Sequence, residues 1–279
     1  AIVKVRSAHD VEWQLPPRAA TLLGWLGQHG LRDHLQATSG QAFMPQLTLP
    51  YLAALGEAYN LQAGTDHRFE LIDDRAERID LRGYEMVWFT CVTPTAPATY
   101  LLADRARAQG CQVAIGGIHA TMMPDEAALH ADAVVQGEGE TTVPALLADY
   151  DRDGRLAPRY RGGCKTPLQA LPQPQWKANP RVRDYAPWVV PVQTSRGCRN
   201  ACYFCSTTRY QGAQRRHRPV GEIVAEIATL KDQGVLTDDK VIFFTDNNIV
   251  SDSDHRRGQR DTRYARALFE ARVELAEAR

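Results

Sequence analysis

The chain has 279 residues, 44% of them hydrophobic and 24% charged, as expected of a globular protein large enough for two domains. Lysine plus arginine balance aspartate plus glutamate at 33 each, which argues against nucleic acid or an anionic membrane as a partner. The longest apolar stretches are well short of the roughly 20 residues of a membrane span, and no signal peptide pattern is present, so a cytoplasmic protein is expected.

Residues 1–150 alternate short β-branched runs with helical stretches. Strands are expected at 1–5, 68–73, 84–92, 111–117 and 131–140, the last including its exit loop. Helices are expected at 48–60, 97–110, 124–131 and 142–151. Because parallel strands need helical crossovers, this α/β alternation predicts a doubly wound parallel sheet of the flavodoxin or Rossmann type. A helical insertion is expected at about 10–45.

Residues 151–190 are rich in proline and weakly periodic, which predicts an extended linker. The region 191–279, whose first strand begins at 189, then shows a second strand at 240–249 and helices at 219–234 and 263–279. Two β-α units cannot close a barrel, because the sheet keeps an open edge. We therefore expect an open β-α arrangement here, and the family resemblance of its cysteine stretch implies the N-terminal part of a β/α barrel in a fragment of a longer protein.

Three of the six cysteines fall within eight residues of the stretch "SRGCRNACYFC": Cys198, Cys202 and Cys205. An iron–sulfur cube normally takes four protein thiolates, so three would leave one iron open to a small ligand. One alternative is a zinc site completed by His217. Another is one face of a helix, although Gly197 and Asn200 favour a loop.

The remaining cysteines are Cys91, Cys111 and Cys164. In a cytoplasmic protein they are expected to be reduced thiols inside or beside strands, and a disulfide framework is not expected.

The stretch "CRNACYFC", placed between a strand and a helix, resembles the Cys-x-x-x-Cys-x-aromatic-Cys signature of radical S-adenosylmethionine (SAM) enzymes. The resemblance implies a [4Fe-4S] cluster on the three cysteines, with SAM on the fourth iron and Phe204 against the adenine. It also implies that Asp246 or Asn247, after the next strand, contacts the SAM amino group. These two side chains are equally typical of a turn that ends a strand.

Ligands of open parallel sheets bind beyond the carboxyl ends of the strands, which here are rich in glycine and hydroxyl groups. The stretch "GGIHATMMPDEAALHADAVVQGEGE" resembles the cobalamin-binding domain that precedes one class of radical SAM enzymes. This resemblance implies the following cobalamin-binding residues: Thr90, Thr93, Gly116, Gly117, His119, Thr121, Gly137, Glu138 and Gly139.

Alternatives exist for several of these polar residues. No histidine stands in the Asp-x-His-x-x-Gly motif that ligates cobalt elsewhere, so His119 is expected at the cobalamin periphery or in local packing. Glu138 and Glu140 are equally typical of helix-entry charges. The basic residues of "RYQGAQRRHRP" are expected to brace a loop, with an anionic partner as the alternative.

The resemblance implies a cobalamin-dependent radical SAM enzyme, in particular one that transfers methyl from methylcobalamin to an unactivated carbon of a small-molecule or peptide substrate. An electron donor such as flavodoxin or ferredoxin is implied as a partner. The first alternative is a radical SAM enzyme that catalyses cyclisation, rearrangement or sulfur insertion. The second is a zinc-binding module without enzymatic activity, and no residue that acts on the substrate is assigned.

Overall fold

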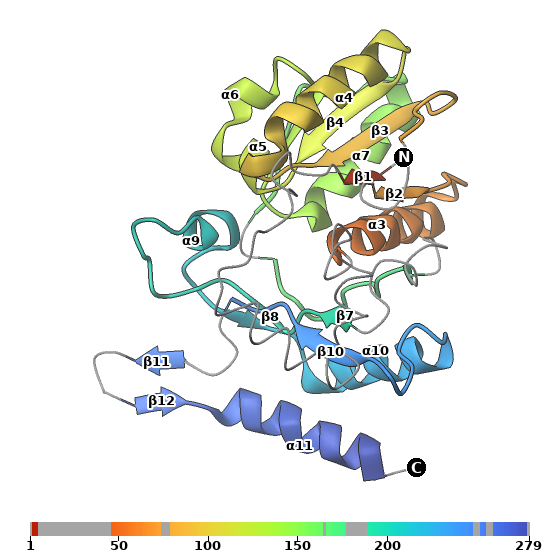
Figure 1. Ribbon diagram of the computed structural model, residues 1–279. Helices are drawn as coiled ribbons and strands as arrows, with labels where there is room; N and C mark the ends of the chain where they lie inside the picture. Colours follow the sequence, from red (N-terminus) through yellow and green to blue (C-terminus); the bar gives the residue numbers. More distant parts are fainter. Residues whose placement is uncertain are drawn as a thin grey trace, which may run out of the picture.

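The computed structural model describes residues 2–4, 46–73, 79–163, 166–176, 189–247, 252–254 and 259–277. These residues form two units, each with its own parallel sheet (Figure 1). The predicted helical insertion at about 10–45 lies outside the described residues.

The first unit is built on six parallel strands in the order β2-β1-β3-β4-β5-β6. Their bounds are β1 (Ile2–Lys4), β2 (Leu71–Asp73), β3 (Met86–Thr90), β4 (Gln112–Gly116), β5 (Ala133–Gln136) and β6 (Arg159–Arg161). The predicted doubly wound parallel sheet is confirmed, and the order of its first five strands is that of flavodoxin. The chain places β2 on one side of β1 and then β3 to β6 on the other side, so the strand order reverses between β1 and β3.

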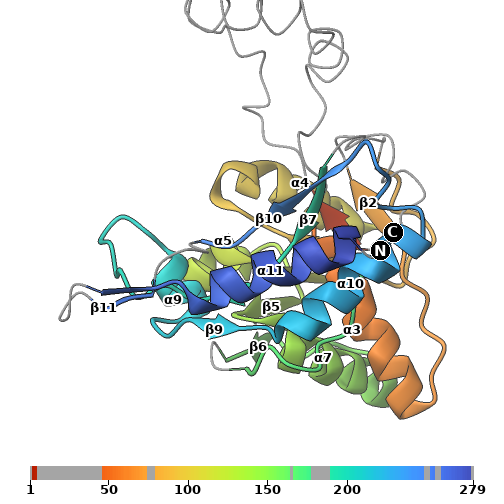
Figure 2. The same cartoon turned by 90° about the horizontal axis from the view of Figure 1, so that it is seen from below.

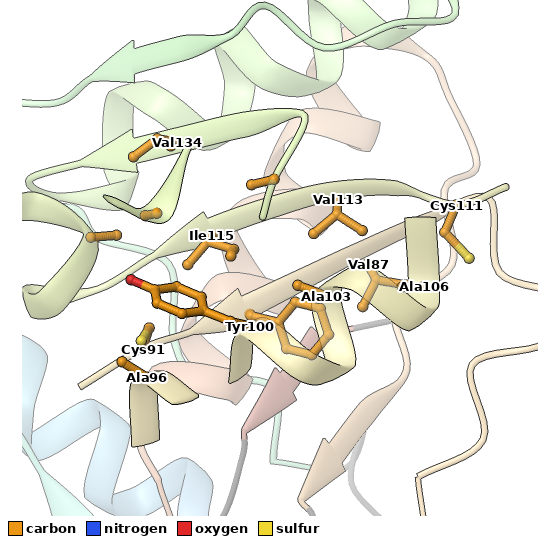
Figure 3. Close-up of a cluster of buried hydrophobic side chains, with 14 of the residues drawn as sticks. Val87, Cys91, Ala96, Tyr100, Ala103, Ala106, Cys111, Val113, Ile115 and Val134 are labelled. Carbon is orange, nitrogen blue, oxygen red and sulfur yellow. The ribbon is translucent and has the colours of Figure 1, made fainter. Parts of the chain in front are cut away.

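Helices cover both faces of this sheet. One face carries α3 (Thr48–Ala63) and α7 (Gly139–Asp153), and the other carries α4 (Ala96–Ala108), preceded by the 3₁₀ turn η1 (Thr93–Thr95). Side chains alternate along β3 because successive residues of a strand point to opposite faces. Val87 and Phe89 pack toward α4, whereas Trp88 packs toward α3 and α7. Figure 3 shows the α4 side of this core, with Tyr100 and Ala103 over Val113 and Ile115.

Three local predictions in the first unit are wrong. The helix expected at 124–131 is only one turn, α6 (Pro124–Ala127), and an unpredicted short helix, α5 (Ile118–Met122), follows β4 directly. The stretch expected as the exit loop of β5 already contains the start of α7 at Gly139. The segment 151–190, expected as an extended linker, includes the end of α7 and the sixth strand of the sheet, and it places Trp176 in the core of the second unit.

The second unit contains the two β-α units that the sequence predicted. Strands β7 (Val189–Val192) and β10 (Val241–Phe244) pair in parallel, with helix α10 (Val220–Asp232) between them in the chain and α11 (Arg263–Glu277) after them. Figure 2 shows α10 and α11 side by side. The sheet of β7 and β10 has only these two strands within the described residues, consistent with the start of a β/α barrel.

Shorter elements complete the second unit. They are β8 (Ser195–Arg196), α9 (Thr207–Gln211), β9 (Arg216–His217), β11 (Asp252–Asp254) and β12 (Gln259–Asp261). Strands β8 and β9 pair antiparallel and frame the cysteine-rich stretch, and β11 and β12 form a second antiparallel pair. Within the described parts of the chain, no helix is both long and apolar enough to cross a membrane.

Gly137, at the end of β5, illustrates how tightly the backbone is packed at the carboxyl edge of the first sheet. It has φ of +80°, and a Cβ atom added there would lie 2.5 Å from the carbonyl oxygen of Gly162. Only glycine fits this position without moving the segment that follows β6.

We therefore expect Gly137→Ala to lower the free energy of unfolding more than Gly110→Ala. Gly110 has φ of +88° but open space where a Cβ atom would lie, so its substitution costs only the roughly 1–2 kcal/mol of a left-handed backbone. Gly137→Ala adds about 1–3 kcal/mol for the steric conflict. Urea unfolding of both variants measures the difference, and equal losses would contradict this account.

Candidate cofactor site between the two units

A cavity of about 630 Å³ lies where the carboxyl ends of the first sheet face the second unit. The first unit contributes residues at the ends of β3, β4 and β5, together with α3 and α7. The second contributes Gln193, Arg196, Arg218 and Thr245, among others. The cavity therefore occupies the edge at which open parallel sheets bind their ligands.

The structure brings together most of the residues predicted to contact cobalamin. Those that line the cavity are Thr90, Gly116, Gly117, Gly137, Glu138 and Gly139. The other three, Thr93, His119 and Thr121, do not line it. The first group lies at the strand ends. In the second group, Thr93 and His119 contact each other beside α4 and α5, and Thr121 bonds the turn after β5.

His119 lies among side chains of its own unit. Its ring is buried, with Nδ1 3.1 Å from Thr93 Oγ1 and Nε2 3.0 Å from Tyr100 Oη. Nε2 is also 3.3 Å from a carboxylate oxygen of Glu126. These contacts agree with the local-packing alternative, in which Thr93 and His119 join η1 to α5.

Thr121 connects two elements at the edge of the cavity. Its hydroxyl donates to the carbonyl oxygen of Gly117 at 2.8 Å and accepts from the backbone N–H of Gly137 at 3.0 Å. The hydroxyl thus fixes the turn after β5 from the side of α5, one step away from the cavity lining.

Glu138 and Glu140 interact with two arginines of the second unit. Arg216 donates to both carboxylate oxygens of Glu138, with distances of 2.5 and 2.9 Å. Arg196 lies 2.5 Å from Glu140 Oε1, which also accepts from the hydroxyl of Tyr51 at 2.6 Å. Glu138 borders the cavity and both of its carboxylate oxygens bind the guanidinium of Arg216, so its contact with cobalamin stays a prediction. Both carboxylates lie at the start of α7, as the helix-entry alternative expects, and in addition they form ion pairs with arginines of the second unit.

The basic stretch that follows the cysteines braces this region. Arg216 binds Glu138, Arg218 lies 2.6 Å from the buried carboxylate of Glu226, and Arg215 contacts the hydroxyl of Ser195 at 3.3 Å. The loop-bracing interpretation is therefore confirmed for these three arginines. Their partners lie far apart in sequence, so periodicity gave no signal for them.

The three cysteines lie on a loop whose two ends are fixed. The backbone N–H of Cys198 donates to the carbonyl oxygen of Gly212 at 3.1 Å, and the hydroxyl of Thr208 donates to the carbonyl oxygen of Cys198 at 3.1 Å. Gly197 has φ of +90°, and a side chain there would clash with the carbonyl oxygen of Gln214. The predicted loop is confirmed, since 198–205 contains no helix.

Between these ends the loop is open to solvent. Residues 199–204 are all exposed, with Tyr203 fully exposed and Phe204 78% exposed. Among the described residues no three His, Cys, Asp or Glu side chains are close enough to hold a metal, so the three thiols are not gathered in this conformation. The five described cysteines, which include the buried Cys91 and Cys111, are all free, consistent with the expected reduced thiols.

The structure gives different surroundings to Asp246 and Asn247, the two residues predicted as alternatives for contact with the SAM amino group. Both carboxylate oxygens of Asp246 accept hydrogen bonds from its own unit, from the backbone and hydroxyl of Thr194 and from Ser195. Asn247 lies beside the cysteine loop: its Oδ1 is 3.3 Å from the hydroxyl of Thr207, which is itself 3.3 Å from the sulfur of Cys205. Thr207 lowers the pKa of the Cys205 thiol through side-chain and backbone hydrogen bonds. None of the three residues predicted to contact SAM, Phe204, Asp246 and Asn247, lines the cavity.

Burial opposes ionisation of Glu140, but its partners outweigh burial. The charge of Arg196 and hydrogen bonds from Tyr51, the backbone and Arg196 together hold the pKa of this carboxyl below its usual range. The same contacts raise the pKa of Arg196 against the effect of its own burial. Burial, followed by the charge of Glu140, raises the pKa of Tyr51, so this phenol stays a hydrogen-bond donor.

Comparison with known proteins identifies the class of the first unit. Residues 37–147 match the B12 binding domain family. This match spans β2 to β5 and most of α7, and so it covers the strand ends that line the cavity.

The wider comparisons extend to the second unit. The chain is 32% identical over 219 residues to bacteriochlorophyllide d C-12(1)-methyltransferase of Chlorobaculum tepidum, covering 77% of this chain and 46% of that protein. Among solved structures it resembles the radical SAM methyltransferase TsrM of Kitasatospora setae, with a TM-score of 0.52 and 17% identity over 72% of this chain and 45% of that one. It also resembles the cobalamin-dependent SAM radical enzyme OxsB, with a TM-score of 0.57 and 13% identity over 76% of this chain and 33% of that one.

The chain thus contains a B12 binding domain, is homologous to a bacteriochlorophyllide methyltransferase and shares the fold of cobalamin-dependent radical SAM enzymes. The family resemblance predicted from the glycine and cysteine motifs is confirmed. The chain spans less than half the length of each of these relatives.

The lowered pKa of Glu140 predicts a specific dependence of stability on pH. A carboxyl whose pKa is depressed by folding stabilises the protein above its unfolded pKa, about 4.3, and loses this contribution as the pH falls through its folded pKa. We expect Glu140→Gln to cost about 3 kcal/mol at pH 7, because it leaves Arg196 buried without its partner. The cost should shrink as the pH falls below the unfolded pKa of about 4.3, and it should be smallest below the depressed folded pKa of Glu140.

Urea unfolding between pH 3 and pH 7 measures this dependence. Glu57→Gln, at an exposed position of α3, is the control and should change stability by less than about 0.5 kcal/mol. A Glu140→Gln variant with the same loss at every pH would show that ionisation of Glu140 does not contribute.

Proposed function

We propose that the chain is part of a cobalamin-dependent radical SAM methyltransferase that methylates an unactivated carbon of a small-molecule or peptide substrate. One observation supports this most directly: a single cavity is bounded both by the strand ends of the B12 binding domain and by residues that flank the cysteine loop. Arg196 precedes the first cysteine by two positions, and Tyr210 and Gln211 end the helix that follows the last.

The cavity lining suits a corrin that carries peripheral amides. Trp88, Val135 and Leu146 provide apolar surface, and Gln193 and Thr245 provide hydrogen-bonding groups on the opposite unit. Large cofactors bind in sites of this mixed character. No histidine lines the cavity within the described residues, which supports cobalamin binding without a protein imidazole on the cobalt.

The chemistry of the three thiols suits a [4Fe-4S] cluster with one open iron. Cys198, Cys202 and Cys205 provide three soft ligands on one short loop, which is held by the backbone bond from Cys198 to Gly212 and by the Thr208 hydroxyl that donates to Cys198. When bound, the cluster and SAM would supply a 5′-deoxyadenosyl radical and cobalamin would supply the methyl group. A cytoplasmic electron donor such as flavodoxin or ferredoxin would provide the electron.

Asn247 is the residue that we assign to the SAM amino group. Its amide oxygen lies on the side of β10 that faces the cysteine loop through Thr207, whereas the carboxylate of Asp246 is engaged with Thr194 and Ser195. An amide oxygen accepts a hydrogen bond from an ammonium group without adding charge. Phe204, exposed on the same loop, would cover the adenine when the loop orders around the cluster.

Anaerobic reconstitution with iron, sulfide and hydroxocobalamin tests the cofactor assignment. We expect the wild-type chain to bind about four irons and one cobalamin, and alanine at any one of the three loop cysteines to remove most of the iron. Cys111→Ala, at a buried free cysteine outside the loop, is the matched control and should retain the cluster.

Metal and spectral analysis distinguish the possible results. A folded chain that binds no cobalamin would contradict the proposal, and stoichiometric zinc without iron would support the zinc-binding module. Release of 5′-deoxyadenosine with no methylated product would favour cyclisation, rearrangement or sulfur insertion over methylation.

Substitutions after β10 test the SAM assignment. We expect Asn247→Ala to weaken SAM binding by about tenfold or more while leaving iron content unchanged, since a hydrogen bond to a charged group contributes roughly 1.5–3 kcal/mol. Asp246→Asn should instead lower the unfolding free energy and leave SAM affinity within about threefold, because Asp246 holds Thr194 and Ser195. Equilibrium dialysis of the reconstituted chain with labelled SAM measures both, and the reverse pattern would reassign the contact to Asp246.

A further inference from the structure

Four buried charges join the two units beside the cavity. Glu138 and Glu140 lie at the start of α7, and Arg196 and Arg216 lie on β8 and β9. Each side chain is at most 11% exposed. Arg196 also lies 3.5 Å from Glu138, so it contacts both carboxylates. We call these four residues the interdomain clamp.

The clamp stabilises the register of the short β-ribbon. Arg196 and Arg216 are paired directly opposite each other on β8 and β9. Two like charges at such positions repel and weaken the ribbon. The two carboxylates of the first unit offset this repulsion, so docking on the first unit favours this register.

The ribbon in turn holds the cysteine loop. Arg196 lies two positions before Cys198, and Arg216 lies beyond the far end of the loop and also donates to the carbonyl oxygen of Gln211 at 3.0 Å. The side chain of Gln211 accepts hydrogen bonds from the backbone of Gly197 at 3.3 Å and from Asn247 at 2.7 Å. Contacts that begin at the clamp therefore reach both ends of the loop and the residue assigned to SAM.

Stability alone does not account for four buried charges. Taking charges out of water costs free energy that their mutual attraction only partly returns, and apolar side chains of similar size often stabilise a protein as well or better. What a bidentate arginine–carboxylate pair adds is a fixed geometry. Here that geometry is the placement of the cysteine loop relative to the carboxyl edge of the first sheet.

We infer that Glu138, Glu140, Arg196 and Arg216 are positioning residues that set the distance and orientation between the cysteine loop and the ligand of the B12 binding domain. The identity of the two ligands rests on the proposed function, whereas the positioning of the loop does not. Glu138 and Arg196 border the cavity, but the role inferred for all four residues is exerted through the placement of the loop.

The first test uses the chain without cofactors. Hydrogen–deuterium exchange should show uptake in peptides from 197–215 rising about tenfold in rate in Glu140→Gln and Arg196→Gln, with uptake in β3 and β4 unchanged as evidence of an intact first unit. Asp149→Asn, at the other end of α7 and bonded only within the first unit, is the matched control and should leave the loop unchanged. Wild-type uptake in the loop of both clamp variants would overturn the inference.

A conservative variant distinguishes the loss of the clamp contact from unfolding of the whole chain. Arg216→Lys keeps the charge but loses the two-point contact with Glu138, so it should fold and show a smaller rise in loop uptake than Arg216→Gln. Equal uptake in the lysine variant, the glutamine variant and the wild type would also overturn the inference.

The second test uses the chain loaded with iron, sulfide and hydroxocobalamin. In Glu140→Gln and Arg216→Lys, whose altered side chains do not line the cavity, the iron and cobalamin contents should match wild type, while the enhancement of cob(II)alamin electron-spin relaxation by the reduced cluster falls at least twofold. Unchanged relaxation in variants with a loosened loop would show that the clamp does not set the spacing of the two ligands. A wild-type chain that binds neither cofactor would contradict the proposed function, and the exchange experiment would still decide whether the clamp positions the loop.

Discussion

The ion network between the start of α7 and the β8–β9 ribbon is the interaction on which the rest of the site depends. The first sheet ends in glycine-rich turns that have few side chains to close the edge, and the second unit closes it through Glu138, Glu140 and their arginines. Ion pairs of defined geometry thus join the two surfaces beside the cavity. Apolar contact between the units would be free to slide, since it has no preferred direction.

The alternation of apolar residues was sufficient to predict the first sheet, but not all of its strands. One apolar face of the sheet follows the two-residue period of a strand and was therefore predictable; it includes Val87, Phe89, Val113 and Ile115. The strand Arg159–Arg161 was missed because its outer residues are charged and it follows a helix with little separation. Helix α5 was missed because five residues are too few to display a helical period.

Backbone geometry made the cavity residues predictable from the sequence, whereas the long-range pairs around them gave no local signal. The rule that ligands bind beyond the carboxyl ends of parallel strands selected Thr90, Gly116 and Gly137 correctly as cavity residues. The pairing of Glu138 with Arg216 could not be predicted, because Arg216 lies 78 positions later and no local pattern connects the two residues. The same limit left Asp246 and Asn247 equivalent in the sequence, although only one of them faces the cysteine loop.

The cysteine loop combines fixed ends with a solvent-exposed middle, and this combination has a physical consequence for metal binding. A loop that is free at both ends would lose the conformational entropy of its whole length when three thiolates converge on one cluster. Here Gly197, Cys198 and Thr208 are already held, so only the exposed residues 199–204 need to rearrange to bring the thiols together. Metal binding supplies the free energy for that rearrangement, as it does when other metal sites fold around their ion. A network that fixes the ends of the loop therefore favours cluster assembly at one place, beside the sheet edge that faces it.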